Sequence, residues 1–290
     1  MTDAVAPDSP TPDAPTSNDA LIAIIGAGVM GETFIGGLMR SGTPAEQIMI
    51  CEQDSTRAAA VCDRFGVSSL SMEAAASTAD VVLIAVKPPD ARSVLPIMGP
   101  LLRPGCVLIS IVAGVPIQTM ESIVADGVCC IRAMPNTPAV IGEGMTVISV
   151  GSGATAQSVA VARELLSVIG QVAEVEEPLQ DAVTAISGSG PAYVFAFMEV
   201  LEAAGIDLGL DPDLARALVR QTVAGAAQLA RVSDAEPAEL RRRVTSPGGT
   251  TQAALRVLIG EKSTGGDLAA LLAHATSAAR DRSIELGRED

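Results

Sequence analysis

The stretch Leu21-Ile-Ala-Ile-Ile-Gly-Ala-Gly-Val-Met-Gly31 decides how the first half of this chain folds. An apolar run that predicts a strand leads into Gly-x-Gly-x-x-Gly, and a segment able to form a helix follows. Gly26 permits a tight turn, Gly28 lets a pyrophosphate approach the backbone, and Gly31 lets the helix pack closely on the strand. The free N–H groups and the helix dipole would hold the anion. We therefore expect Gly26, Ala27, Gly28, Val29, Met30 and Gly31 to bind a dinucleotide; the alternative is a glycine turn without a ligand.

Short apolar runs alternate with amphipathic stretches on both sides of this loop. The runs are Leu21–Gly26, Ile48–Cys51, Val81–Val86, Cys106–Ile111, Val128–Ile131, Met145–Val150 and Gln171–Val175. Helices are expected over Glu32–Arg40, Ser55–Phe65, Met72–Ser77, Ala91–Met98, Ile117–Val124 and Ala154–Ile169. Val- and Ile-rich strands bounded by turns are typical of the parallel sheet of a βαβ domain, buried on both faces. The fold class is thus α/β, with an N-terminal Rossmann-type dinucleotide-binding domain.

From about Pro178 the strand signals stop and helical patterns take over. Asp211-Pro212 predicts an N-cap and first-turn proline for a helix through about Arg231. Ser233 to Glu236 fits a capping box before a short helix ending near Val244, and Ser246-Pro-Gly-Gly249 interrupts the pattern. We expect three regions: a disordered acidic, proline-rich tail (1–19), a dinucleotide-binding domain (20–177) and an all-α domain (178–290).

Composition excludes several function classes. The 290 residues include 19 Lys+Arg and 34 Asp+Glu, a net charge of −15, and only 2% aromatics without Trp. Nucleic acid is therefore not an expected partner, because binding it needs clustered cations or stacking platforms. The single His274 argues against His-rich metal sites and most Ser-His-Asp schemes, so no metal site is expected.

The sequence also bears on location. No apolar run reaches the roughly 18 residues of a membrane span, so no membrane partner is expected. The tail has neither the basic n-region nor the apolar core of a signal peptide. Five cysteines, none in a C-x-x-C pair, fit buried thiols in a reducing cytoplasm.

Polar residues at the ends of three predicted strands are further candidates for cofactor binding. Glu52 ends the second run, where an acidic residue usually accepts hydrogen bonds from the adenosine ribose and repels a 2′-phosphate. That favours NAD, although the nearby Arg57 could pair with a phosphate. Lys87-Pro88 and Asn136 follow two other strands, where ligands of open α/β sheets bind. The alternatives are a solvated strand end, a surface lysine and a rigid polar turn.

Two glycine-rich segments lie in the helical half. Ser187-Gly-Ser-Gly-Pro-Ala-Tyr-Val194 and Thr245-Ser-Pro-Gly-Gly-Thr-Thr251 each place small and hydroxylic residues just before a helix. Backbone N–H groups and hydroxyls at a helix N-terminus suit a small carboxylate. Two packing turns between closely crossing helices are the equal alternative.

Together these segments resemble pyrroline-5-carboxylate reductase. The resemblance covers Leu21 to about Leu286 and rests on Gly26–Gly31, Val86–Pro88, Arg132–Pro138, Ser187–Tyr193 and Thr245–Thr251 in this order. It implies reduction of 1-pyrroline-5-carboxylate to L-proline, the last step of proline biosynthesis, with NADPH or NADH as cofactor. Glu52 departs from the family's small hydroxylic residue or Asn-Arg at that position, which weakens the expectation of a strong NADP preference.

The resemblance also implies roles for individual residues. Thr251 would hydrogen-bond the ring nitrogen of the imine as the catalytic hydroxyl. The substrate carboxylate would be held by the loop residues Ser246, Gly248, Gly249, Thr250 and Thr251. Since the cofactor supplies the hydride, no strong base is required.

The helical domain is expected to form an oligomer. The helix Pro212–Arg231 is apolar or small around most of its circumference, so most of it must be buried. A two-fold partner would bury the excess, with packing on the same chain as the alternative. The resemblance implies a dimer that can assemble into rings, often decamers, with the substrate loop near the partner chain.

Two other functions remain open. A β-hydroxyacid dehydrogenase has a related layout, but it needs a lysine in the helix after its glycine loop, and Ser187–Leu201 contains none. A non-catalytic sensor of NAD(P)H would keep Gly26–Gly31 without needing Ser246–Thr251.

Overall fold

The computed structural model describes residues 20–260 and 266–288, so the predicted tail at 1–19 lies outside the described residues. The described chain forms two compact units. Unit 1 comprises residues 20–188 and 280–288, and unit 2 comprises 189–260 and 266–279.

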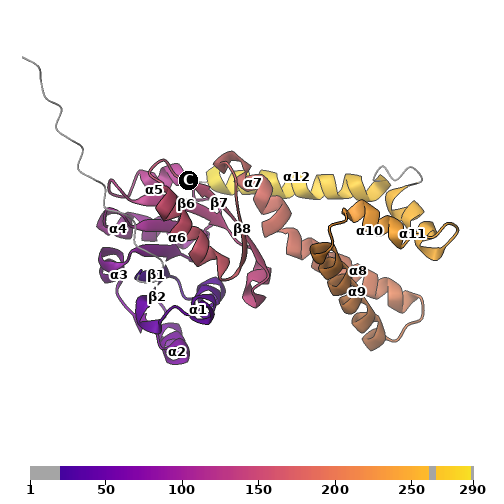
Figure 1. The fold of residues 1–290 in the computed structure, drawn as a ribbon, viewed down its shortest axis with the longest axis horizontal. Coiled ribbons are helices and arrows are strands. Elements are labelled where there is room, and N and C mark those ends of the chain that lie inside the picture. The colour runs from indigo at the N-terminus through magenta and orange to yellow at the C-terminus, as the bar shows by residue number, and fades with distance from the viewer. Residues whose placement is uncertain (1–19, 261–265, 289–290) are drawn as a thin grey trace, which may run out of the picture. The chain divides into compact units, whose positions relative to one another are not determined.

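Unit 1 is built on a sheet of eight strands in the order β3-β2-β1-β4-β5-β6-β7-β8 (Figure 1). The strands are β1 (Ile22–Ile25), β2 (Ile48–Cys51), β3 (Ser68–Ser69), β4 (Val81–Ile84), β5 (Val107–Ser110), β6 (Cys129–Met134), β7 (Gly144–Val150) and β8 (Gly170–Glu174). All residues of β1, β2, β4 and β5 are buried, as continuous apolar strands covered on both faces require. The predicted α/β fold is confirmed.

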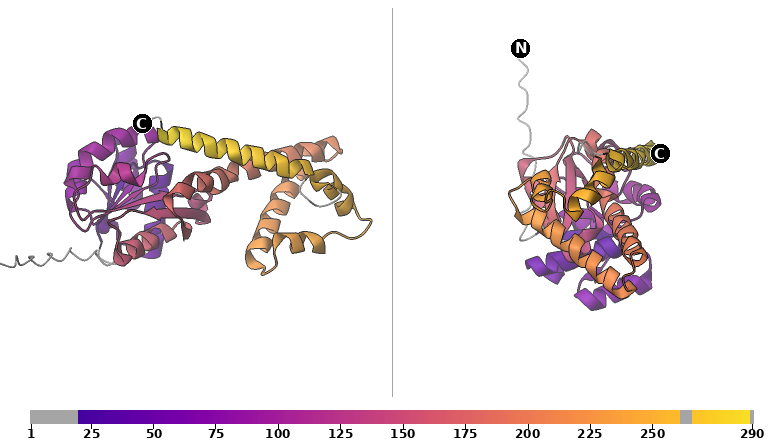
Figure 2. Two further views of the ribbon diagram at one scale, coloured as in Figure 1. Left: turned by 90° about the horizontal axis from the view of Figure 1, so that it is seen from above. Right: turned by 90° about the vertical axis from the view of Figure 1, so that its right-hand side faces the viewer.

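Helices cover both faces of this sheet (Figure 2). The helices of unit 1 are α1 (Val29–Ser41), α2 (Ser55–Phe65), α3 (Met72–Thr78), α4 (Pro88–Met98), α5 (Ile117–Glu121), α6 (Ala156–Ser167) and α7 (Gln180–Val183). Short 3-10 helices lie at Ala45–Gln47, Gly99–Leu101, Thr137–Ile141 and Glu177–Leu179. Ile22 and Ile24 pack with α1, α2 and α6, whereas Ala23 and Ile25 pack with α3, α4 and α5.

The sheet departs from the expected parallel arrangement at one point. β7 runs antiparallel to β6, and β8 runs parallel to β7. Residues 135–143 alone connect β6 to β7, which is too short for the helical crossover that parallel neighbours need. The two-residue β3 was not predicted, because Ser68 and Ser69 are polar and exposed.

Unit 2 is helical, as predicted. Its helices are α8 (Gly190–Asp207), α9 (Pro212–Val232), α10 (Pro237–Arg243), α11 (Thr250–Ile259) and the first part of α12 (Gly266–Arg288). Asp211 caps α9 as expected, since its side chain accepts hydrogen bonds from the N–H groups of Asp213 and Leu214.

One expected helix start is wrong, and a second is correct in position but is not a free helix end. Glu236, and not Ser233, is the N-cap of α10, and the Ser233 hydroxyl instead accepts from the N–H of Ala235. The Ser187 segment does precede a helix, since α8 begins at Gly190, but this helix start is not free because a π-helical turn (Thr184–Gly188) joins α7 to α8. A side chain at Gly188 would meet Met134, so glycine is needed for packing there.

The end of α12 belongs to unit 1. The hydroxyl of Ser283 donates to Asp181 at 2.7 Å, and a side chain at Gly114 would meet the backbone of Leu286. The chain thus leaves unit 1 after Gly188 and returns to it at Arg280.

Candidate active site

The glycine loop after β1 has three glycines with three different constraints. Gly26 has a φ of +96°, which disfavours any side chain, and its N–H donates to the carbonyl of Cys51 at 2.8 Å. A Cβ at Gly31 would collide with the carbonyl oxygen of Gly26, so α1 approaches the loop closely only with glycine at that position. Both residues are therefore required by the fold itself.

Gly28 is the exception, because a Cβ there would meet no protein atom within 4 Å. It is the N-cap of α1 and makes no side-chain cap, so the first-turn N–H groups of the helix remain open to an anion. Nothing in the protein requires glycine at this place. The open space at Gly28 leaves room for a ligand to approach the backbone, and the free N–H groups beside it could hold an anion such as a pyrophosphate.

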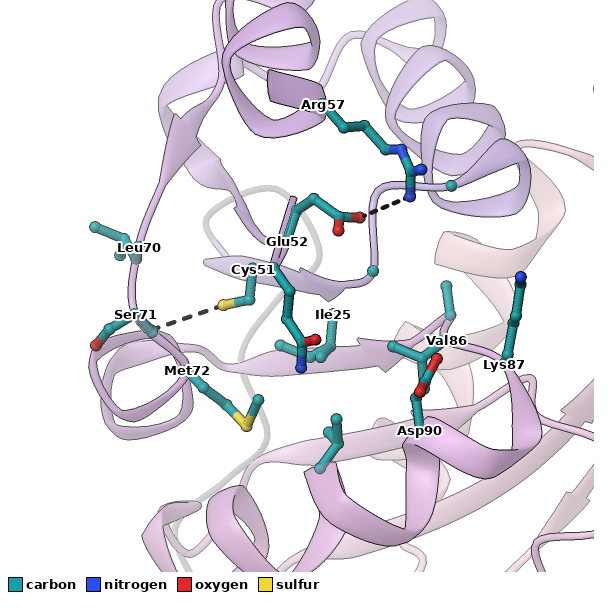
Figure 3. A pocket seen from close by; sticks show the side chains of 15 residues that line it. Ile25, Cys51, Glu52, Arg57, Leu70, Ser71, Met72, Val86, Lys87 and Asp90 are labelled. Carbon is teal, nitrogen blue, oxygen red and sulfur yellow. Dashed lines mark hydrogen bonds and ion pairs between the residues drawn. The ribbon is translucent and has the colours of Figure 1, made fainter. Parts of the chain in front are cut away.

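A pocket of about 360 Å³ opens at the carboxyl ends of β1, β2 and β4 (Figure 3). It is lined by Ile25, Gly26, Gly28, Cys51, Glu52, Gln53, Arg57, Leu70, Ser71, Met72, Ala85, Val86, Lys87, Asp90 and Val94. This is where open α/β sheets bind nucleotides. The pocket brings together four of the predicted cofactor residues, namely Gly26, Gly28, Glu52 and Lys87.

Glu52 joins the second strand to the glycine loop. Its Oε2 accepts a hydrogen bond from the N–H of Ala27 at 3.0 Å, and its Oε1 accepts from the N–H of Asp54 at 3.0 Å. Arg57 lies 3.5 Å from Oε2, and Figure 3 shows the two side chains pointing toward each other. Only 10% of the Glu52 side chain is exposed, so this carboxylate forms one wall of the pocket.

Lys87 and Pro88 stand at the start of α4. Lys87 is the N-cap of that helix, is exposed, and lies at the pocket (Figure 3). Pro88 begins the helix, where the missing N–H of proline costs nothing. Pro88 does not line the pocket, so its part is to fix the direction of α4 beside Lys87.

Asn136 is held by the protein's own groups. Its Nδ2 donates to the carbonyl and hydroxyl oxygens of Ser187 at 3.2 and 3.3 Å, and its Oδ1 accepts from the N–H of Met145 at 2.9 Å. It ties the loop after β6 to the π-helical turn before α8. Asn136 is not among the residues lining the pocket, and the contacts described for it are structural.

The loop Ser246–Gly249 precedes α11 in unit 2. Gly248 has a φ of +73°, its N–H donates to the side-chain oxygen of Gln252 at 2.8 Å, and the N–H of Gly249 donates to the carbonyl of Ser246. Gly249 is the N-cap of α11, without a side-chain cap. The N–H groups of Thr250 and Thr251 lie in the first turn, where a helix offers them no internal acceptor. The loop is thus a rigid turn that presents two amides and the half-buried Thr251.

Sequence reasoning missed part of the pocket. Leu70, Ser71 and Met72 line it from the connection between β3 and α3. No motif marks them, because their position depends on how β3 pairs with β2. Their contribution is the apolar and hydroxyl wall on that side (Figure 3).

Burial keeps three thiols of unit 1 protonated at neutral pH. Burial raises the pKa of Cys51 to about 11 and those of Cys106 and Cys130 to about 12. All five cysteines are free. Across residues 20–260 and 266–288, no cluster of His, Cys, Asp and Glu could hold a metal ion, and no helix has the length and apolar character to cross a membrane.

Comparison with known proteins identifies both halves of the chain. Residues 177–286 match the family model "Pyrroline-5-carboxylate reductase dimerisation", and residues 21–114 match "NADP oxidoreductase coenzyme F420-dependent". The pyrroline-5-carboxylate reductase of Pseudomonas aeruginosa is 40% identical over 270 residues, which cover 92% of this chain and 97% of that relative.

Solved structures agree. A pyrroline-5-carboxylate reductase from Coxiella burnetii superposes with a TM-score of 0.86 at 33% identity, covering 93% of this chain and 99% of that one. The Plasmodium falciparum pyrroline carboxylate reductase with NADP bound gives 0.78 at 30% identity, covering 93% and 99%.

Proposed function

This chain belongs to the pyrroline-5-carboxylate reductase family, and we propose that it reduces 1-pyrroline-5-carboxylate to L-proline, the last step of proline biosynthesis. It is an NAD(P)H-dependent oxidoreductase acting on a C=N bond. In this assignment residues 20–177 bind the cofactor, and residues 178–290 bind the substrate and dimerise. The observation that carries the assignment is the open space at Gly28, which the protein's own packing leaves unexplained.

The cofactor is assigned to the pocket of unit 1. When bound, NAD(P)H supplies a hydride to the imine carbon, while a proton goes to the ring nitrogen, so that C=N becomes CH–NH. Gly26 to Gly31 would hold the pyrophosphate, with Gly28 leaving room for it. Glu52 would face the adenosine ribose and Lys87 would offer a positive charge at the pocket. Asn136 would keep the loop after β6 in place.

The substrate is assigned to the loop before α11. The first-turn N–H groups of Thr250 and Thr251, with the hydroxyl of Ser246, would hold the carboxylate of the imine. Gly248 and Gly249 would shape the turn, because their own N–H groups already donate to Gln252 and Ser246. The hydroxyl of Thr251 would hydrogen-bond the ring nitrogen and pass on its proton. No strong base is needed for this step.

The working form is a homo-oligomer. The matching dimerisation model covers α8, α9, α10 and α11. Unit 2 also leaves large apolar side chains exposed, among them Phe195, Val200 and Leu208. We propose a dimer at least, with decamers as its further assembly. The substrate is a small molecule, nucleic acid has no role, and the enzyme works in the cytoplasm.

A turnover assay tests the assignment. Enzyme, 1-pyrroline-5-carboxylate and either NADH or NADPH are mixed, and the loss of absorbance at the nicotinamide band is followed together with proline formation. We expect proline and oxidised cofactor in equal amounts. Cofactor binding without proline formation would instead favour a sensor of NAD(P)H.

A further inference from the structure

The groups beside Glu52 show how this pocket treats the extra phosphate of NADPH. In Rossmann folds the residue at the end of the second strand faces the adenosine ribose, where NADPH carries a 2′-phosphate and NADH a hydroxyl. A 2′-phosphate is normally accommodated by a nearby arginine or by the free N–H groups of a helix start. Arg57 lines this pocket, and Asp54, the N-cap of α2, directly follows Gln53, another residue of the lining.

The arginine is already paired. The guanidinium of Arg57 lies 3.5 Å from the carboxylate of Glu52 and 3.9 Å from that of Asp54. It therefore faces two negative charges with one positive charge. A phosphate would have to displace these carboxylates to reach it.

The start of α2 is also occupied. Oδ1 of Asp54 accepts hydrogen bonds from the N–H groups of Thr56 at 2.9 Å and Arg57 at 3.2 Å. Asp54 is held in turn, because its own N–H donates to Glu52. The carboxylates of Glu52 and Asp54 thus already bind the N–H groups at the start of α2 and the guanidinium of Arg57, which could otherwise bind a phosphate.

We propose that Glu52 and Asp54 together make this chain select NADH over NADPH, by filling the 2′-phosphate position with the protein's own negative charge. The proposal rests on the proposed function and concerns the same pocket. A 2′-phosphate would meet two carboxylates and an arginine that is no longer available, and like charges a few ångströms apart repel. The 2′-hydroxyl of NADH instead finds the Glu52 carboxylate as an acceptor.

Calorimetric titration of the full-length protein with NADH and NADPH separately tests the proposal. We expect NADH to bind at least about 10-fold more tightly than NADPH in the unmodified chain. In the double variant Glu52→Gln, Asp54→Ser the NADPH affinity should rise at least about 10-fold. Serine remains a good N-cap, so α2 should keep its start, which circular dichroism checks.

Arg57→Ala separates the proposal from a simple charge effect. In the double variant it should abolish the gain in NADPH affinity. Asp63→Asn, an exposed charge change on α2 that does not line the pocket, is the matched control and should alter neither affinity.

Two results would overturn the proposal. One is an unmodified chain that binds NADPH as tightly as NADH, and the other is a double variant whose NADPH affinity does not rise. With proline formation intact, either leaves the proposed function standing. Binding of neither nucleotide would overturn both.

Discussion

The two units of this chain differ in how they bury their apolar side chains. In unit 1 the strands β1, β2, β4 and β5 are wholly buried, and two apolar clusters fill the faces of the sheet. In unit 2 only Ala215, Val219 and Ile259 are buried apolar residues among those the structure describes. Phe195 is 61% exposed and Leu208 is 86% exposed. Unit 1 buries its apolar side chains within one chain, whereas unit 2 leaves large ones exposed, as a unit that matches a dimerisation model would.

A substitution in the packed interior of unit 1 should have the largest effect on the free energy of unfolding, and this effect should not depend on protein concentration. Gly31→Val places a side chain against the carbonyl oxygen of Gly26. Such overpacking against backbone should cost roughly 3 kcal/mol or more of the free energy of unfolding. Thermal unfolding followed by circular dichroism, repeated over a range of concentrations, measures it. An unchanged melting temperature would contradict the close approach of α1 to its loop.

Gly28→Val is the matched contrast in the same loop. Its side chain meets open space, so unit 1 should fold as before. Cofactor affinity should nevertheless fall by roughly 100-fold or more, because the side chain fills the place of the phosphates. Calorimetry with NADH measures this loss, and unchanged affinity would remove the loop from the cofactor site.

Substitutions of the exposed apolar side chains of unit 2 should instead have an effect that depends on protein concentration. Phe195→Asp with Val200→Asp would bury two charges in an apolar interface, which should weaken association by roughly 100-fold or more. Light scattering at low micromolar concentration should then show the mass of one chain, with the cofactor still bound. Val200→Leu is the conservative control. If the unmodified enzyme is active with the mass of one chain, the exposed apolar face of unit 2 is not an interface between copies.

Thr251→Ala should affect neither folding nor association. The lost hydroxyl acts mainly in the transition state. The activation free energy should therefore rise by roughly 2–3 kcal/mol, which lowers kcat tens- to hundreds-fold. The affinity for NADH, which belongs to unit 1, should not change. Thr251→Ser should keep most of the activity. Unchanged kcat and KM for the imine would remove Thr251 from the mechanism.

The smallest effect concerns the buried thiols, all of which lie in unit 1. Burial raises the pKa of Cys106 and Cys130 from 9.0 to about 12, so the folded protein keeps these protons at a pH where the unfolded chain loses them. Below about pH 9 both the folded and the unfolded chain keep these protons, so the thiols do not lower the free energy of unfolding. As the pH rises from 9 toward 12, the free energy of unfolding falls. Melting at pH 7 and pH 10 measures it, and Cys130→Ala should reduce the difference between the two.

Much of the first unit could be predicted from sequence, because its strands are continuous apolar runs and its glycines stand at the first strand-to-helix turn. The reversal of β7 could also have been inferred from the nine residues of its connection, but an apolar run carries no strand direction. The network around Glu52 could not, since whether Arg57 faces a ligand or Glu52 depends on side-chain geometry.

Local capping signals predicted one helix start correctly and another wrongly. The N-cap at Asp211 was correct because aspartate before proline has few other interpretations. The hydroxyl of Ser233 instead accepts from the N–H of Ala235 and Glu236 is the N-cap, so a serine three residues before a glutamate did not by itself determine where α10 begins. Asn136 had the right motif, yet the contacts described for it are with Ser187 and Met145.

The return of α12 to unit 1 makes unit 2 an insertion, with the chain entering after Gly188 and leaving at Arg280. A fragment that stops at the sequence boundary near 178 would lose the contact between Asp181 and Ser283. The unit that binds the cofactor is therefore discontinuous along the chain. Exchange of the helical unit between relatives would need two crossover points. Any single C-terminal truncation that removes unit 2 would also remove the part of unit 1 that follows it in the sequence.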